Sequence, residues 1–274
     1  MAETGTGQEA PASALPHFEP PRFQALRSIL ALVLREMGST YGRSPGGYIW
    51  AILQPIGALA VMSVAFSAVL RSPSLGTSFI LFYATGFLPF GGYGEVQRKT
   101  TSALRYSKSL LAYPRVTWLD AILSRLVLAV LTRVTVGCIV FTGILMFVDT
   151  RAVLSIGPIL NATAMAASIG LGVGMMNCLL NGLLPIWSSI WSIITAPLFL
   201  ASGVFFLYED MPSFAQDILW WNPILHAVGL MRRGFYPTYE ASYVSLFYGY
   251  GLSATLILLA LIFLRRHHKR VLEN

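Results

Sequence analysis

Two arginines interrupt a stretch of the chain that is otherwise apolar, and they are its clearest candidates for chemistry. Arg125 and Arg133 lie in the first half of the run from about 121 to 148. A charge inside the membrane is costly, so such residues are functional candidates by default. Guanidinium groups bind carboxylates and phosphates, which predicts that these positions attract anionic groups. The alternative is that both side chains extend to the headgroups at the inner membrane surface.

The remaining residues offer little support for catalysis or metal binding. The sequence contains no Gly-Lys dipeptide and therefore no phosphate-binding loop of the GxxxxGK[ST] kind. The histidines are too far apart to converge on a metal; they are His17, His226, His267 and His268. No predicted span carries a carboxylate in its middle, which disfavours transport coupled to protons or sodium. We therefore predict no catalytic residue, metal or bound cofactor in this chain, so another subunit would supply energy for uphill transport.

The elements that position these residues are predicted to be membrane helices. Of the 274 residues, 55% are hydrophobic and 11% are charged, whereas a soluble domain carries about 25% charged residues. This composition excludes a soluble enzyme and predicts an all-α membrane protein. The sequence predicts six transmembrane helices, at about 48–70, 77–94, 121–148, 153–179, 187–207 and 244–264.

The six spans form a predicted transmembrane domain over residues 22–264. Residues 1–21 are expected to be a disordered cytoplasmic leader and residues 265–274 a basic cytoplasmic tail. An amphipathic helix over Phe23–Met37 is predicted to lie in the cytoplasmic interface before the first span. The charge-free segment Ile218–Met231 is too short to cross, which predicts a periplasmic re-entrant segment before the last span. The predicted cytoplasmic pieces hold 13 basic residues and the outer pieces hold 4, so both termini are expected to be cytoplasmic.

Three blocks of residues resemble one protein family. They are Leu34-Arg35-Glu36 with Tyr41-Gly42 and the run Gly47–Pro55, then Tyr113-Pro114-Arg115 with Leu119-Asp120 and Ser124-Arg125, and finally Trp221–His226 with Arg232. Together they resemble the ABC-2 type export permeases, and they are most similar to the capsule polysaccharide export branch. Thr40 and Gly46 depart from the family's usual residues in the first block. The blocks occur in register with the six spans, so the resemblance covers roughly residues 22–264.

The resemblance implies a multi-pass permease of the bacterial inner membrane that works as a homodimer. It implies two copies of an ATP-binding cassette subunit, which would bind the ATP and magnesium. It further implies an acidic, lipid-linked capsular polysaccharide as substrate, a periplasmic adaptor and an outer-membrane export pore, and no nucleic acid. The nearest alternative is export of O-antigen or teichoic acid, and another is export of a small molecule. A membrane-embedded glycan transferase or acyltransferase would need a polar catalytic cluster that the sequence lacks.

The resemblance also gives roles to particular residues. Because sugars stack on aromatic faces and guanidinium groups attract acids, the substrate path is expected at Arg125, Arg133, Trp187, Trp191, Phe199, Phe205, Phe206, Tyr248 and Tyr250. An outer gate is expected at Trp220, Trp221, Asn222, Pro223 and His226. Coupling to the ATPase is expected at Arg27, Arg35, Glu36, Arg98, Leu104, Arg105, Lys108 and Arg115.

Each of these roles has a simpler alternative that the sequence leaves open. The aromatic residues would then face lipid or pack in the core, and the outer segment would be an interfacial helix without a gating role. The interfacial helix would only anchor the protein, and the basic loop would only carry the positive charge typical of cytoplasmic loops. Gly170, Gly172 and Gly174 predict close helix packing rather than binding.

Overall fold

The regular structure is helical throughout the part of the chain that is described. The computed structural model describes residues 24–41, 47–111, 116–150 and 152–273, and no strand occurs within these ranges. This confirms the predicted all-α class. The predicted leader and Arg115 lie outside the described residues. The helices are α1 (Gln24–Tyr41), α2 (Gly47–Ser67), α3 (Phe79–Thr101), α4 (Ala103–Tyr106), α5 (Trp118–Phe147), α6 (Ile156–Leu183), α7 (Trp187–Leu200), the short 3-10 helix η1 (Tyr208–Asp210), α8 (Ser213–Leu219), α9 (Pro223–Phe235) and α10 (Leu246–Glu273).

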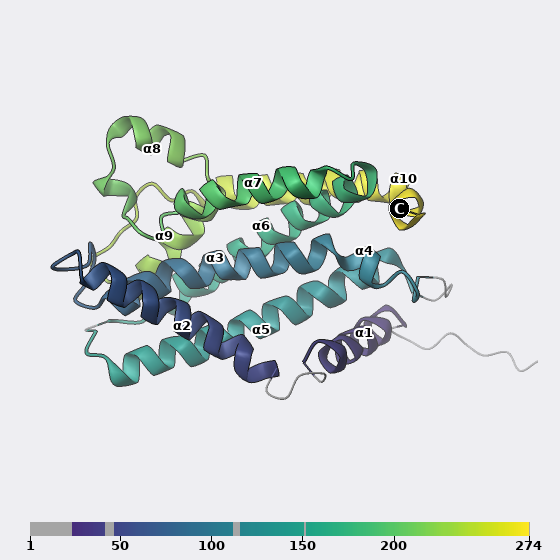
Figure 1. The fold of residues 1–274 in the computed structure, drawn as a ribbon. Helices are drawn as coiled ribbons and strands as arrows, with labels where there is room; N and C mark the ends of the chain where they lie inside the picture. The colour runs from purple at the N-terminus through teal and green to yellow at the C-terminus, as the bar shows by residue number, and fades with distance from the viewer. Residues whose placement is uncertain (1–23, 42–46, 112–115, 151, 274) are drawn as a thin grey trace, which may run out of the picture.

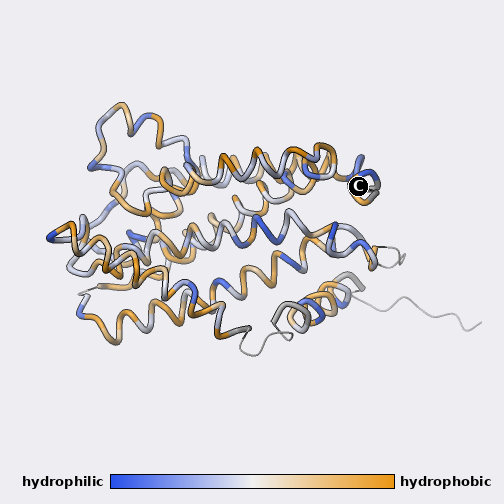
Figure 2. Tube along the Cα trace, in the orientation of Figure 1, coloured by the Kyte–Doolittle hydropathy of each residue, from blue (hydrophilic) through white to orange (hydrophobic). Residues whose placement is uncertain are grey.

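Six helices form a bundle in which successive members run in opposite directions (Figure 1). These helices are α2, α3, α5, α6, α7 and α10. One end of the bundle carries α1, α4 and the C-terminal end of α10, and we call it the α4 end. The other end carries α8 and α9, and we call it the α8 end (Figure 1). Hydrophobic residues occur along most of the length of the long helices. Hydrophilic residues occur among them in α3 and α5, in the halves nearer the α4 end (Figure 2).

Four of the described helices are long and apolar enough to cross a membrane, namely α2 over Ile49–Ser67, α5, α6 and α10 over Leu246–His268. The apolar helix α7 has only 14 residues. The 23-residue helix α3 carries a carboxylate and two cations in its last two turns, at Glu95, Arg98 and Lys99. The predicted count of six spans therefore stays a prediction for α3 and α7.

Several helix ends differ from the predicted bounds. The sequence predicts a span that ends near 94, but α3 continues to Thr101. The sequence predicted a span from 187 to 207, but α7 ends at Leu200. The chain leaves the helix there because Gly203 takes up a left-handed backbone conformation, with a φ of +71°. At the other end of the chain, α10 continues through the predicted basic tail to Glu273.

The predicted close packing of glycines is confirmed on α6, which lies between α3 and α10. A Cβ atom at Gly170 would lie 2.7 Å from the carbonyl oxygen of Tyr93, and one at Gly174 would lie 2.9 Å from the carbonyl oxygen of Gln97. Both carbonyls belong to α3. A Cβ atom at Gly172 would lie 3.1 Å from the carbonyl oxygen of Ser253 on α10. Small residues spaced four apart thus let the α3 and α6 backbones approach closely, as membrane helices commonly do.

A Gly174→Ala substitution is expected to destabilise the protein by about 1–3 kcal/mol, because the added methyl group overpacks the α3–α6 contact. The measurement is the thermal unfolding midpoint of the purified protein in detergent. Gly143→Ala on α5 is the matched control, since nothing lies within 4 Å of a Cβ atom there. Equal midpoints for the two variants would contradict the packing argument.

The helix α5 carries both arginines singled out from the sequence. A capping box fixes its start: the Thr117 hydroxyl accepts from the Asp120 N–H at 3.2 Å, and the Asp120 carboxylate accepts from the Thr117 N–H at 2.9 Å. From this start, the 30-residue helix places Arg125 toward the α4 end and Arg133 at its middle.

Candidate functional site

A groove runs between α2, α3, α5 and α7, with a volume of about 850 Å³. Large aromatic side chains line much of it, namely Trp50, Phe87, Phe90, Tyr93, Trp191 and Phe199. Gln54, Gln97 and Thr195 also line it; the Gln97 amide already donates to Thr101 and the Thr195 hydroxyl to the carbonyl of Trp191. The groove therefore combines flat apolar faces, on which sugar rings stack, with groups that form hydrogen bonds.

A cluster of four charged side chains lies at one part of this groove. The Glu95 carboxylate lies 2.6 Å from the Arg98 guanidinium, 3.7 Å from the Lys99 ammonium and 3.1 Å from the Arg133 guanidinium. The first three residues come together because they are spaced three and four apart on α3. Arg133 reaches them from α5, and Gly91 on α3 leaves room for its guanidinium. We call these four residues the Glu95 cluster, and it holds three cations and one carboxylate.

The structure brings together three residues of the predicted substrate path. Arg133, Trp191 and Phe199 all line the groove. Phe205 lies behind Phe199, with the two ring centroids 5.3 Å apart. The Trp187 indole stacks on that of Trp191, with the ring centroids 6.5 Å apart. Its N–H donates a hydrogen bond to the side chain of Asn177 on α6.

The other predicted path residues lie elsewhere. The carbonyl of Phe206 accepts a hydrogen bond from Arg232, and Tyr250 donates to the carbonyl of Asn161 on α6. Tyr248 lies beside Trp220 near the α8 end. Arg125 does not line the groove and belongs to a separate junction.

Arg125 joins three helices to α5 at the α4 end. Its Nε donates to the Glu36 carboxylate of α1 at 3.1 Å. Its Nη1 donates to the carbonyl of Lys99 at 3.1 Å and to the hydroxyl of Ser102 at 2.6 Å, where α3 meets α4. The guanidinium also lies 4.1 Å from the ring centroid of Tyr106 on α4. The side chains of Arg125 and Glu36 are only 6% and 8% exposed, so this is a buried ion pair.

The predicted coupling residues lie around this junction. Leu104 on α4 is fully buried and packs in a cluster with Ile122 and Met175. Four of the predicted coupling residues are exposed cations at this end, namely Arg27, Arg35, Arg105 and Lys108. Arg98 differs from them because it also takes part in the Glu95 cluster. The α4 end thus presents positive side chains from α1 and α4 around a buried ionic junction.

The predicted gate residues meet where α9 begins. Asn222 caps α9, because its side-chain oxygen accepts from the Ile224 N–H at 3.0 Å. Its amide nitrogen donates to the carbonyl of Ala201 and to the hydroxyl of Ser202, each at 3.1 Å. Pro223 occupies the first helical position, where its missing N–H costs nothing. This cap ties the start of α9 to the chain that leaves α7.

His226 connects this turn to the start of α10. Its Nδ1 accepts from the Ser245 N–H at 3.1 Å, so its Nε2 carries the proton and donates to the Trp220 carbonyl at 2.9 Å. Burial lowers the pKa of the His226 imidazole below its ordinary value, which favours the neutral ring that these two bonds require. Trp221 packs against Trp220, with the ring centroids 5.4 Å apart, and is exposed.

Arg232 is a structural group that the sequence interpretation missed. It is one of the four basic residues of the predicted outer pieces, yet it is 0% exposed. Its guanidinium donates to the carbonyls of Phe206 at 2.8 Å and Val204 at 3.2 Å, and it lies 4.4 Å from the ring centroid of Phe82. The only sequence signal was its place in the third family block. Arg232 therefore holds the segment between α7 and α8 against α9 and α3.

Replacing Arg232 with methionine is expected to loosen the segment from 201 to 207, because two carbonyls lose their donors at a cost of about 1–3 kcal/mol each. Limited proteolysis of the purified protein would show faster cleavage in this segment. Arg233→Met is the control, since Arg233 is the exposed neighbour on the same helix. Equal cleavage rates for both variants would contradict the assigned role.

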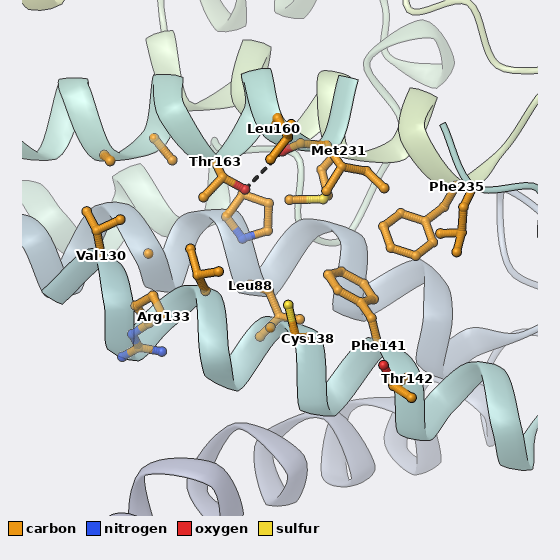
Figure 3. A pocket seen from close by; sticks show the side chains of 18 of the residues that line it. Leu88, Val130, Arg133, Cys138, Phe141, Thr142, Leu160, Thr163, Met231 and Phe235 are labelled. Carbon is orange, nitrogen blue, oxygen red and sulfur yellow. Dashed lines mark hydrogen bonds between the residues drawn. The ribbon is translucent and has the colours of Figure 1, made fainter. Parts of the chain in front are cut away.

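A second pocket, of about 300 Å³, lies among α3, α5, α6 and α9. Figure 3 shows it lined by apolar side chains such as Leu88, Phe141 and Phe235, and the Arg133 guanidinium is turned away from them. The hydroxyl of Thr163 is already bonded to the carbonyl of Ile159. This pocket offers little to a polar ligand, so the candidate site is the groove on the other side of α5.

Comparison with known proteins identifies the family of this chain. The chain belongs to the ABC-2 type transporter family, whose pattern matches residues 27–236.

Its relatives are similar over most of their length. The chain is 25% identical to the polysialic acid transport protein KpsM of Escherichia coli, over 81% of this chain and 86% of that protein. It is 26% identical to the capsule polysaccharide export inner-membrane protein BexB of Haemophilus influenzae, over 89% of this chain and 92% of that protein. It is 24% identical to the protein of the same description, CtrC, of Neisseria meningitidis, again over 89% and 92%. The family predicted from the sequence is therefore confirmed.

Proposed function

We propose that this chain is the permease subunit of an ATP-driven exporter that moves capsular polysaccharide across the inner membrane. Membership of the ABC-2 type transporter family and the names of the similar proteins support this function. The observation that carries it furthest is the groove, which combines stacking faces with an excess of cations. An acidic, lipid-linked polysaccharide is the substrate that fits such a surface.

We further propose that α2, α3, α5, α6, α7 and α10 are the six spans. Their alternating directions support a topology in which α1 and the end of α10 share one side (Figure 1). The excess of basic residues at the α4 end supports a cytoplasmic location for that side. In this topology α1 is the interfacial helix, and α9 is the core of a periplasmic re-entrant segment.

The permease is proposed to act as a homodimer. Residues of both α2 and α7 line its groove. Both helices also carry large exposed apolar residues, including Ile49, Trp50 and Ile193. A second copy of the chain would cover these faces and complete a conduit lined by aromatic residues from both protomers.

Energy is proposed to enter at the α4 end from two copies of a separate ATP-binding cassette subunit. That subunit would bind the ATP and magnesium, and this chain would carry out no hydrolysis. Closure of the ATPase would push on α1 and α4, which the junction of Arg125 and Glu36 links to α3 and α5. The same movement would open the path past the groove toward the gate residues at Trp220 and Trp221. A periplasmic adaptor and an outer-membrane pore would receive the polymer.

The direct test is deletion of the gene in its host, followed by sugar analysis of surface and intracellular polysaccharide. We expect an acidic polymer to disappear from the surface and to accumulate inside the cell, and a plasmid copy of the gene to reverse both changes. An unchanged capsule would contradict the proposal. Loss of O-antigen or teichoic acid instead of a capsule would identify a different glycan as the substrate.

A further inference from the structure

The Glu95 cluster contains more positive than negative charge, although it lies within the bundle. One carboxylate, 15% exposed, lies within 4 Å of three cationic side chains. Two of the cations, Arg98 and Arg133, also line the groove. Their side chains are 69% and 23% exposed, so a ligand in the groove reaches both.

The carboxylate of Glu95 occupies these cations in the same way that an anionic ligand would. Its Oε2 accepts from Nη2 of Arg98 at 2.6 Å and from Nη2 of Arg133 at 3.1 Å. A guanidinium group bonds carboxylates of any origin through the same donors. A sugar carboxylate in the groove and the Glu95 carboxylate therefore compete for the same N–H groups.

We propose that Glu95 competes with an acidic polysaccharide for Arg98 and Arg133. This competition weakens the binding of the polysaccharide and so speeds its passage. The inference rests on the proposed export function and names the chemical class that the groove recognises, which is a carboxylated sugar. Three cations alone would hold a polyanion tightly and retain it. Conduction requires a site that is favourable enough to enter and weak enough to leave. Glu95 supplies the second condition, because each sugar carboxylate is displaced when Glu95 returns to its cations.

The competing explanation is that Glu95 only ties α3 to α5 through Arg133. The two explanations differ for the isosteric variant Glu95→Gln. A merely structural role predicts weaker or unchanged binding of any glycan in this variant. A competitor role predicts tighter binding of acidic glycans alone, because the cations lose their internal anion while the side chain keeps its shape.

The experiment uses the permease purified together with its ATP-binding subunits in lipid nanodiscs without ATP. The probes are a fluorescent oligosaccharide of sialic acid and a neutral dextran oligosaccharide of the same length, neither of which carries a lipid. We expect Glu95→Gln to bind the acidic probe about tenfold more tightly, equivalent to 1.4 kcal/mol. We expect its affinity for dextran to stay unchanged. The difference should shrink at high salt, because screening weakens charge interactions.

Two further variants complete the test. Asp149→Asn removes a carboxylate from an exposed turn outside the groove and should bind both probes as the wild type does. Arg98→Gln removes an exposed cation with little risk to folding, and it should weaken binding of the acidic probe only. Unchanged or weaker acidic binding by Glu95→Gln would overturn the inference. If that variant does not fold, unchanged acidic binding by Arg98→Gln would overturn it.

The inference and the proposed function fail in different ways. If the wild-type gene does not restore surface polysaccharide to the deletion strain, the export function fails. If it restores the polymer and the Glu95→Gln complex binds both probes as the wild type does, the inference alone is overturned.

Discussion

Replacing Arg125 with methionine is expected to remove export and to lower stability by about 3–5 kcal/mol, because it removes the cation that donates to the buried Glu36 carboxylate. The Glu36 carboxylate is 8% exposed and lies 3.1 Å from Nε of Arg125. The same substitution also takes away the donors to Lys99 and Ser102 at the α3–α4 corner. The measurements are the thermal unfolding midpoint of the purified permease and surface polysaccharide in the complemented deletion strain.

A double variant separates folding from coupling at this junction. Replacing a buried ion pair with apolar residues of similar size is often neutral or stabilising. Glu36→Leu combined with Arg125→Met is therefore expected to recover the unfolding midpoint. Export should stay lost, because no side chain then binds the corner formed by Lys99 and Ser102 to α1. Arg71→Met, at an exposed outer turn, is the control for loss of a cation. Normal export by the double variant would show that the junction has a structural role only.

The positions of the long helices follow from the sequence because a membrane helix needs about 20 predominantly apolar residues in a row. Each of the six predicted segments overlaps a helix of the structure. The ends are harder to predict, since they depend on local events that hydropathy does not record. One such event is the left-handed turn at Gly203, which ends α7 early. Another is the continuation of α10 past Leu264, where exposed cations are compatible with a helix outside the apolar region.

The candidate site was predictable only in part, and the reason lies in tertiary packing. Aromatic residues and Arg133 stand out by type, so their selection required no knowledge of their neighbours. Glu95 was overlooked because it follows the predicted end of a span at 94, while α3 in fact continues to Thr101. The partner of Arg125 lies 89 residues away, and no spacing rule connects such positions. In the sequence Arg232 cannot be told from an exposed loop charge, because the two carbonyls that it binds are brought to it only by folding.

The second large effect is expected for Arg133→Leu, which should reduce export of an acidic polysaccharide to background while the protein stays folded. Arg133 is the residue of the Glu95 cluster that lies on α5, and it lines the groove together with Trp191 and Phe199. Its loss leaves Glu95 paired with Arg98 and Lys99, so no carboxylate is left without a cation. The cost to folding should therefore be small, in contrast to that of Arg125→Met. Surface polysaccharide and the unfolding midpoint measure the two effects.

The charge and the shape of the Arg133 side chain are expected to contribute separately. A lysine at this position keeps the positive charge but lacks the fork that binds a carboxylate through two parallel N–H groups. Arg133→Lys should therefore export at a rate between those of the wild type and Arg133→Leu. Arg266→Leu on the exposed end of α10 controls for a general loss of positive charge. If Arg133→Leu exports normally, the cation has no part in moving the polymer. The aromatic faces of the groove would then have to guide it alone, and a neutral glycan would pass as readily as an acidic one.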